Sequence, residues 1–189
     1  MSGTKNKNDL RYQKREKKIF GALIRIVKKE EYAMTVRPSR VYREAGVSRS
    51  TFRRHYREVG EILEKKDEEL LREFRSITGG DLKTAWRKTL IFIAKNREVF
   101  EMKFAKTDDR LLRRMVEWLD RKLGFGWGRY GARVRLRIFE MFYAEVVGVM
   151  NIWAKEGMKI EGIEKMATEL AHLTTTADKR WGSVVTERF

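Results

Sequence analysis

Arginines are concentrated in "GVSRSTFRRHY", residues 46–56, in an order that suits contact with DNA. If this segment is helical, Phe52, His55 and Tyr56 share one face, because they are three and four residues apart. The opposite face then carries cationic and hydroxyl side chains, which are Arg49, Ser50, Arg53 and Arg54. A guanidinium group can form two hydrogen bonds with guanine or bind a backbone phosphate. The pattern predicts a DNA-contacting helix that is anchored by its aromatic face.

The charge of the whole chain favours the same interpretation. Its 189 residues include 43 Lys and Arg against 27 Asp and Glu, a formal net charge of +16. Residues 1–66 alone hold 19 basic and 8 acidic side chains, so most of the excess lies in the first third. We expect a polyanionic partner, with nucleic acid as the first interpretation and an anionic membrane as the second. A chain that is basic only for solubility is the alternative.

Several classes of chemistry find little support in the sequence. The absence of cysteine excludes disulfides and thiol chemistry, and the only two histidines are far apart, which disfavours a zinc site. Apart from Ser48, Ser50 and Thr51 near His55, we identify no serine or threonine with a partner histidine, and the arginine-rich helix explains those three better than catalysis does. We therefore expect no enzyme activity, cofactor or metal. The first residues do not resemble a secretory signal, and no stretch reaches about 18 apolar residues. No membrane contact and a cytoplasmic location are therefore expected.

The elements that must position the arginines are expected to be helices. A single proline and apolar residues at three- and four-residue steps predict an all-helical fold. The expected helices cover residues 10–31, 36–45, 49–56, 59–77, 82–94, 97–105, 108–123, 132–156 and 160–175. Thr35, Ser48 and Asp81 are suited to cap helix N-termini, and Gly46 is suited to end the second helix with a positive φ.

A glycine-rich segment, "GWGRYG" at residues 126–131, formally matches the dinucleotide-binding pattern GxGxxG. That site requires a preceding strand, whereas the residues before this segment follow a helical pattern. We therefore expect a loop between helices, which could gate a ligand pocket. An enzyme built around the glycines is kept as a lesser alternative.

The segment "TVRPSRVYREAGVSRSTFRRHYREVGEIL", residues 35–63, resembles the helix-turn-helix of the TetR/AcrR (tetracycline-repressor) family of transcription regulators. The positions in register are Thr35, Val36, Val41, Ala45, Gly46, Val47, Ser48, Thr51, Phe52, His55, Tyr56 and Ile62. Three positions depart from the motif, since Tyr42, Arg53 and Val59 stand where it has Ala, Tyr and Lys. The Tyr and Lys normally contact phosphates, so the resemblance implies no particular operator sequence.

The resemblance implies a homodimer that binds a palindromic operator on double-stranded DNA, most simply a repressor released by a small apolar effector. The expected DNA contacts are Thr35, Arg37, Arg40, Ser48, Arg49, Ser50, Thr51, Arg53, Arg54, His55, Tyr56 and Arg57. For His55, a packed ring is the favoured alternative to one that reads a base. The alternative function is a basic helical protein that binds nucleic acid without sequence specificity.

The resemblance also implies a helix-turn-helix domain (10–60) and a helical effector and dimerisation domain (61–176). The polar, basic composition of residues 1–9 predicts a flexible arm, and residues 177–189 are expected to form a tail. An apolar effector pocket would be lined by Trp86, Phe92, Phe100, Met102, Phe104, Met115, Trp118, Phe139 and Phe142. The dimer interface would be formed by Val146, Met150, Trp153, Met166, Leu170 and Leu173. For both sets, packing in the core of one chain is the alternative.

Overall fold

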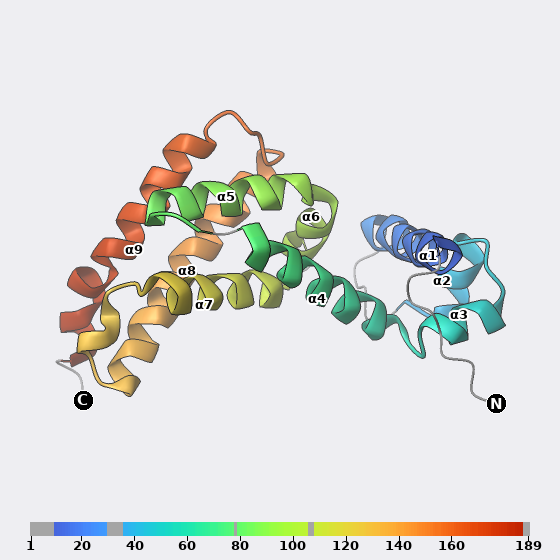
Figure 1. The fold of residues 1–189 in the computed structure, drawn as a ribbon, viewed down its shortest axis with the longest axis horizontal. Coiled ribbons are helices and arrows are strands. Elements are labelled where there is room, and N and C mark those ends of the chain that lie inside the picture. The colour runs from blue at the N-terminus through green and yellow to red at the C-terminus, as the bar shows by residue number, and fades with distance from the viewer. Residues whose placement is uncertain (1–9, 30–35, 78, 106–107, 187–189) are drawn as a thin grey trace. The chain divides into compact units, whose positions relative to one another are not determined.

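The computed structural model describes residues 10–29, 36–77, 79–105 and 108–186 (Figure 1). These residues are helical with short connections, and none of them lies in a β-strand, which confirms the predicted all-helical class. The chain divides into two compact units, Met1–Glu69 (unit 1) and Leu70–Phe189 (unit 2), each described here by itself. Across the described residues, no helix is both long enough and apolar enough to cross a bilayer.

The described part of unit 1 is built from helices that pack around a small apolar core (Figure 1). They are α1 (Leu10–Lys29), α2 (Pro38–Glu44), α3 (Arg49–His55) and the first turns of α4 (Val59–Ile77). α1 packs against α2, and α2 packs against α3. The largest side chains of this core are fully buried; they include Ile19, Leu23, Val41, Phe52 and Ile62. Burial of each such side chain contributes about 1.5–3 kcal/mol of transfer free energy.

The second helix begins later than its sequence suggested. Pro38 is its first helical residue, and Arg37 occupies the N-cap position in an extended conformation without a side-chain capping bond. Thr35, the expected cap, lies outside the described residues. Proline suits the first helical position because it lacks an N–H and because it holds the preceding residue in an extended conformation. The proline therefore sets the start of this helix.

The turn between α2 and α3 is closed by two backbone hydrogen bonds. The Gly46 N–H donates to the Arg43 carbonyl at 3.0 Å, and the Val47 N–H donates to the Tyr42 carbonyl at 3.0 Å. This pair of bonds defines a Schellman motif, which requires a left-handed residue just after the helix. Gly46 supplies it with a φ of +62°, as the sequence predicted. The turn fixes where α3 starts relative to α2.

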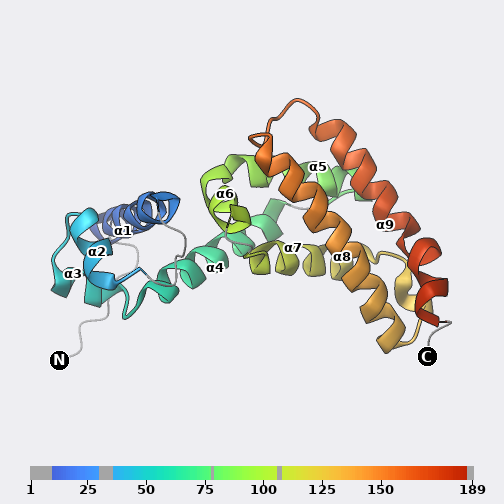
Figure 2. The same ribbon diagram turned by 180° about the vertical axis from the view of Figure 1, so that it is seen from behind.

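Unit 2 consists of five further α-helices and one short 3-10 helix in its described residues, together with the end of α4. They are α5 (Leu82–Lys95), α6 (Arg97–Ala105), α7 (Arg110–Leu123), η2 (Trp127–Arg129), α8 (Ala132–Lys155) and α9 (Ile163–Thr186). α5 and α8 both pack against α9, which Figure 2 shows from behind. As predicted, the Asp81 carboxylate caps α5, accepting a hydrogen bond from the Thr84 N–H at 2.7 Å. All five tryptophans of the chain belong to unit 2.

The last helix continues well beyond the end expected near residue 175, so that expectation is wrong. α9 runs to Thr186. Its buried stripe uses small side chains, Thr174 and Ala177, which do not register as a strong apolar pattern. The Thr174 hydroxyl accepts a hydrogen bond from Trp86 Nε1 at 3.0 Å, and Arg180 Nη2 donates to the Glu145 carboxylate at 2.6 Å. The contact of Arg180 with Glu145 on α8 lies beyond the expected end and attaches the extension to the fold.

The glycine-rich segment lies between two helices, as expected for a loop and not for a dinucleotide site. It contains η2 and connects α7 to α8. Gly124, just before the segment, and Gly126, its first residue, have φ values of +61° and +82°, which other residues rarely adopt. The segment therefore turns sharply twice within a few residues.

Candidate nucleic-acid interface

The helix α3 is started by a single serine. Ser48 has extended backbone angles, and its Oγ accepts a hydrogen bond from the Thr51 N–H at 3.1 Å. The same hydroxyl lies 2.9 Å from Thr51 Oγ1 and 3.0 Å from Ser50 Oγ. A serine N-cap stabilises a helix by about 1 kcal/mol. Because α3 has only seven residues, this cap and the preceding Schellman turn largely determine its first turn.

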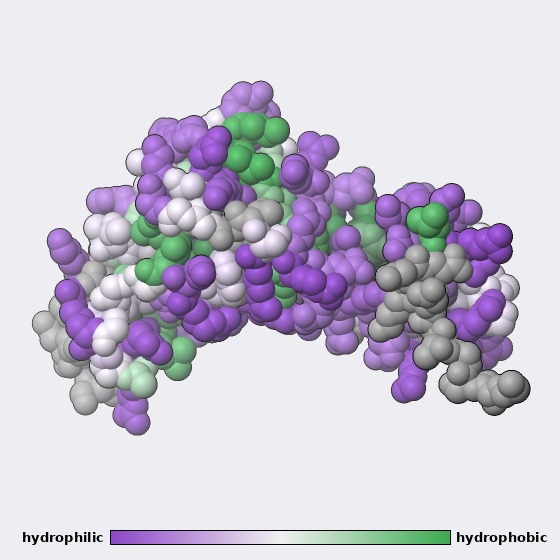
Figure 3. Space-filling model, viewed as in Figure 1, coloured by the Kyte–Doolittle hydropathy of each residue, from purple (hydrophilic) through white to green (hydrophobic). Residues whose placement is uncertain are grey.

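The outer face of α3 exposes guanidinium and hydroxyl groups. Arg49, Ser50, Arg53 and Arg54 are all exposed, and Thr51 is half-buried. Among the described residues, Arg49 and Arg53 have no carboxylate within ion-pairing distance. On the side seen in Figure 3, the described surface of unit 1 is mainly hydrophilic. This face can donate several hydrogen bonds at once to a polyanion.

Neighbouring residues extend the same cationic surface. Arg37, Arg40 and Arg57 are exposed, at the start of α2 and just after α3. The Arg57 backbone N–H donates to the Glu61 carboxylate at 2.7 Å, which fixes the connection into α4. Of the residues predicted to contact DNA, the exposed arginines and hydroxyls thus belong to α2, α3 and their flanks, and Thr35 lies outside the described residues.

The inner face of α3 is aromatic, which confirms the predicted separation of its two faces. Phe52 is buried, and its ring centroid lies 6.2 Å from Tyr42 and 6.0 Å from Tyr56. Tyr56 is also buried, and the side chain of His55 is only 2% exposed. His55 and Tyr56 were included among the expected DNA contacts, but both side chains are buried, and for His55 this agrees with the favoured alternative of a packed ring. Their rings fill the interior of unit 1, so they position α3 and do not belong to its outer face.

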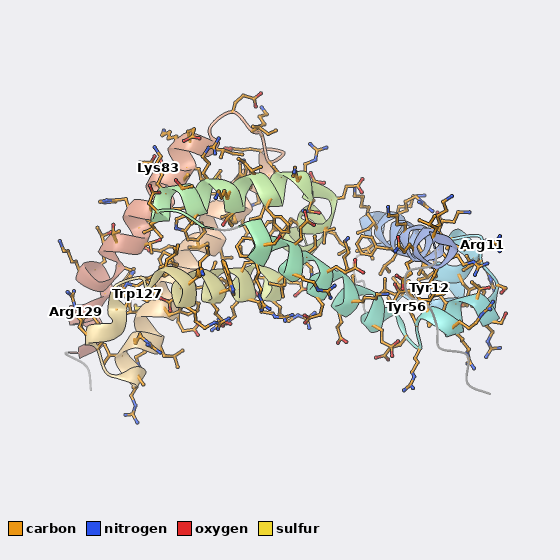
Figure 4. The ribbon with its side chains drawn as sticks, viewed as in Figure 1. Arg11, Tyr12, Tyr56, Lys83, Trp127 and Arg129 are labelled. Carbon is orange, nitrogen blue, oxygen red and sulfur yellow. The ribbon has the colours of Figure 1, made fainter. Side chains whose placement is uncertain are left out.

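Three residues outside α3 complete a polar cluster beneath it, which we call the anchoring cluster: Tyr12, Glu16 and Lys65 together with His55 and Tyr56. The Tyr12 ring stacks on His55 with centroids 4.0 Å apart. Glu16 Oε1 accepts hydrogen bonds from Tyr56 Oη at 3.4 Å and from Lys65 Nζ, and it lies 3.5 Å from His55 Nδ1. Figure 4 labels Tyr12 and Tyr56 in unit 1. One carboxylate thus joins α1, the end of α3 and α4.

Burial and the nearby carboxylate shift the protonation of these rings. Burial is the main cause that lowers the pKa of His55 below its usual value, although Glu16 opposes the shift. Burial, aided by the charge of Glu16, raises the pKa of Tyr56 and of Tyr12. At neutral pH the tyrosines are protonated and Tyr56 can donate to Glu16, while His55 is largely neutral. The positive charge of the cluster then comes from Lys65, and it balances Glu16.

The sequence reasoning missed Tyr12 and Glu16, although a signal for them exists. Tyr12, Glu16, Ile19 and Leu23 follow one another at four-, three- and four-residue steps, so they share one face of α1. If the apolar stripe of this helix is extended toward its N-terminus, Tyr12 and Glu16 fall on the face that packs against the rest of unit 1. Their contacts with His55 and Tyr56 span about forty residues of chain, which periodicity alone does not reveal.

The nine side chains expected to line an effector pocket lie in the interior of unit 2. Seven are buried, and Phe104 and Trp118 are half-buried. Trp86 and Phe142, for example, meet edge to face with ring centroids 6.4 Å apart. Edge-to-face contacts of this kind are typical of a packed core. The existence of an effector cavity stays a prediction.

Most residues expected at a dimer interface are instead buried within the single chain. They are Val146, Met150, Trp153 and Leu170. Met166 and Leu173 are half-buried. The buried stripes lie where α8 packs against α9 of the same chain, so the expectation for these four residues is corrected. A 3.6-residue period shows that a helix face is apolar, but it does not show which helix covers that face.

Comparison of the chain with models of known protein families gives no match, and comparison with curated proteins gives none either.

Proposed function

We propose that the chain is a sequence-specific DNA-binding transcription regulator in which α2 and α3 form a helix-turn-helix. In this proposal α3 enters the major groove while α2 and its flanks contact the phosphate backbone. One observation carries it: a short, capped helix buries its aromatic face and exposes guanidinium and hydroxyl groups on the other. The resemblance of residues 35–63 to the TetR/AcrR helix-turn-helix supports the same assignment.

The anchoring cluster gives the proposal a physical basis. Base recognition by Arg49 or Arg53 requires a fixed guanidinium position, because each bidentate pair discriminates by about 1–3 kcal/mol only when its geometry is correct. The buried rings of Phe52, His55 and Tyr56 hold α3 against its neighbours. The exposed arginines therefore extend from a helix whose position is fixed by its buried side chains.

Regulation and assembly belong to the same proposal. Two copies would bind a palindromic operator with their α3 helices about 34–36 Å apart, and an effector bound by unit 2 would change that spacing and release DNA. Because the buried α8 and α9 stripes are occupied within one chain, the dimer contact must use exposed residues. Ile152 on α8, which is 62% exposed, is such a residue.

The decisive experiment is selection of bound duplexes from a random pool by the full-length protein. We expect an inverted repeat with half-sites about one helical turn apart, bound at least ~10³-fold more tightly than random duplex. Arg53→Ala should weaken binding to the selected duplex by about 1–3 kcal/mol. Arg72→Ala, which removes an exposed arginine of α4 in unit 2, is the matched control and should leave binding unchanged. Equal affinity for selected and random duplexes would instead indicate a nucleic-acid-binding protein without sequence specificity.

A further inference from the structure

A second concentration of positive charge lies in unit 2, around the glycine-rich loop. Residues 121–139 contain six basic side chains and no acidic one. These are Arg121, Lys122, Arg129, Arg133, Arg135 and Arg137. The other residues of 67–189 carry 18 basic and 19 acidic side chains, so this one stretch accounts for the whole positive excess of that part of the chain. We call the six side chains the loop cations.

Buried aromatic side chains anchor the loop that carries these cations. Phe125 and Trp127 are buried, and their ring centroids are 5.4 Å apart. The Trp127 ring also lies 5.2 Å from Phe142 and 6.3 Å from Phe139, both on α8. Figures 1 and 2 both place the end of α7, η2 and the start of α8 at one end of unit 2. The backbone that carries the loop cations is therefore held in place by buried aromatic side chains.

Four of the loop cations lie at the ends of the two helices that flank the loop. Arg121 and Lys122 at the end of α7, and Arg133 and Arg135 at the start of α8, are all exposed. Among the described residues, none of these four has a carboxylate within ion-pairing distance. Arg129, labelled in Figure 4, is exposed too, and its guanidinium lies 5.1 Å from the Tyr130 ring centroid.

Helix stability explains the cations at the end of α7 but not those at the start of α8. Cations in the last turn of α7 interact favourably with the helix dipole, but cations near the start of α8 interact unfavourably with it. The first turn of α8 contains no acidic residue to compensate. Arg133 and Arg135 thus repel both the helix terminus and the other loop cations. A bound polyanion would remove this repulsion.

We propose that the loop cations bind the phosphate backbone of nucleic acid without reading bases, as a second contact surface in addition to α3. A phosphate backbone fits better than an anionic membrane, because binding to a bilayer surface also requires a substantial apolar face. In this stretch, Leu136 is the only large apolar side chain of the described residues that is strongly exposed, at 58%. Phosphates, in contrast, require only positive charge and hydrogen-bond donors.

The test measures how the affinity of the full-length protein for a random-sequence duplex depends on salt. Each phosphate contact that is lost lowers the slope of log K against log salt by about 0.9. The triple variant Arg121→Gln, Arg133→Gln, Arg135→Gln should therefore lower the slope by up to about 2.7. The matched control neutralises three exposed lysines of unit 2 outside the loop, Lys83, Lys155 and Lys159 (Lys83 is labelled in Figure 4). It should leave the slope nearly unchanged.

Two outcomes would overturn the proposal. The first is an equal loss of slope in the cluster variant and the lysine control, which would indicate general charge attraction. The second is unchanged DNA binding together with lost binding to phosphatidylserine vesicles, which would indicate a membrane surface. Circular dichroism spectra and melting temperatures of both variants check that they fold.

The result is separable from that of the proposed function. The preference for a selected duplex over a random one depends on α3, so the triple variant should retain this ratio while its slope falls. If the wild-type protein shows no such preference, the regulator proposal fails, but the slope comparison still decides whether the loop cations contact phosphates.

Discussion

Two regions of the molecule combine a buried layer of aromatic side chains with exposed cations: helix α3 in unit 1 and the loop around η2 in unit 2. α3 is a regular helix, so its arginines have the fixed spacing that base recognition needs. The loop turns at Gly124 and Gly126 and distributes its cations over two helices and a 3-10 turn. Such an arrangement suits phosphates, which tolerate varied geometry. A regular backbone is thus the difference on which we base the two proposals, sequence recognition for α3 and phosphate binding for the loop.

The buried aromatic layers beneath the two regions also differ in their polar groups. Beneath α3, Glu16 accepts hydrogen bonds from Tyr56 and Lys65. Among the described residues, the buried Nε1 of Trp127 beneath the loop has no hydrogen-bond partner, and neither has the buried Nδ1 of His55 beneath α3. A buried donor without a partner costs about 1–3 kcal/mol. What distinguishes the buried layer beneath α3 is the Glu16 carboxylate, which joins α1, α4 and the end of α3.

The largest expected effect comes from removing the aromatic anchor of α3. Phe52→Ala leaves a cavity in the core of unit 1 and should lower its free energy of unfolding by about 3–5 kcal/mol. Urea denaturation followed by circular dichroism measures this loss. Phe104→Ala, at a half-buried position in unit 2, should cost less and serves as the comparison. Equal losses in the two variants would contradict the anchoring role.

Removing the carboxylate that joins α1, α3 and α4 should have the next largest effect. Glu16→Leu deprives Tyr56 and Lys65 of their common acceptor and should cost about 1–3 kcal/mol of stability. Because α3 loses its anchor and not its arginines, affinity for a selected duplex should fall while the salt dependence of binding stays the same. Glu16→Gln, which keeps an acceptor, should restore part of the affinity. A changed salt slope in Glu16→Leu would show that Glu16 does not act through positioning.

Replacing a turn glycine tests whether its backbone conformation, and not the space around it, requires glycine. Gly46→Ala forces a side chain into a left-handed conformation and should destabilise unit 1 by about 1 kcal/mol, although no atom would obstruct the new methyl group. Gly128→Ala, within η2, is the matched control, since Gly128 lacks a positive φ and its position is also open. Thermal melts compare the two. A loss at Gly128 as large as that at Gly46 would mean that the Schellman turn has no special importance.

The smallest expected effect is a pH dependence from His55. Since its pKa is lower in the folded state than in the unfolded chain, the unfolded chain binds more protons. This contribution to stability is fully present above about pH 6.5, the ordinary value for histidine, and is lost as the pH falls through the folded-state pKa. Urea denaturation of the wild type at pH 7.5 and 5.5, compared with His55→Gln, measures it. An identical pH dependence in the variant would exclude His55 as the cause.

Local patterns in the sequence predicted most helices, but they did not predict contacts between residues that are far apart in the sequence. The bounds of α4, the Asp81 cap and the positive φ of Gly46 each depend on a few adjacent residues, and the structure agrees with all three. The helical extension beyond residue 175 depends on small residues that pack only because α5 and α8 lie beside them. Likewise, Val146 and Leu170 carry the apolar period of an interface, and only the fold shows that one chain covers both.

The uneven placement of the tryptophans offers a way to observe the two units separately. With every indole in unit 2, intrinsic indole emission follows the unfolding of that unit alone. The far-ultraviolet helical signal, in contrast, sums over both units. If a denaturant unfolds unit 1 first, ellipticity falls while emission stays constant, so two spectra taken on one sample show which unit unfolds first.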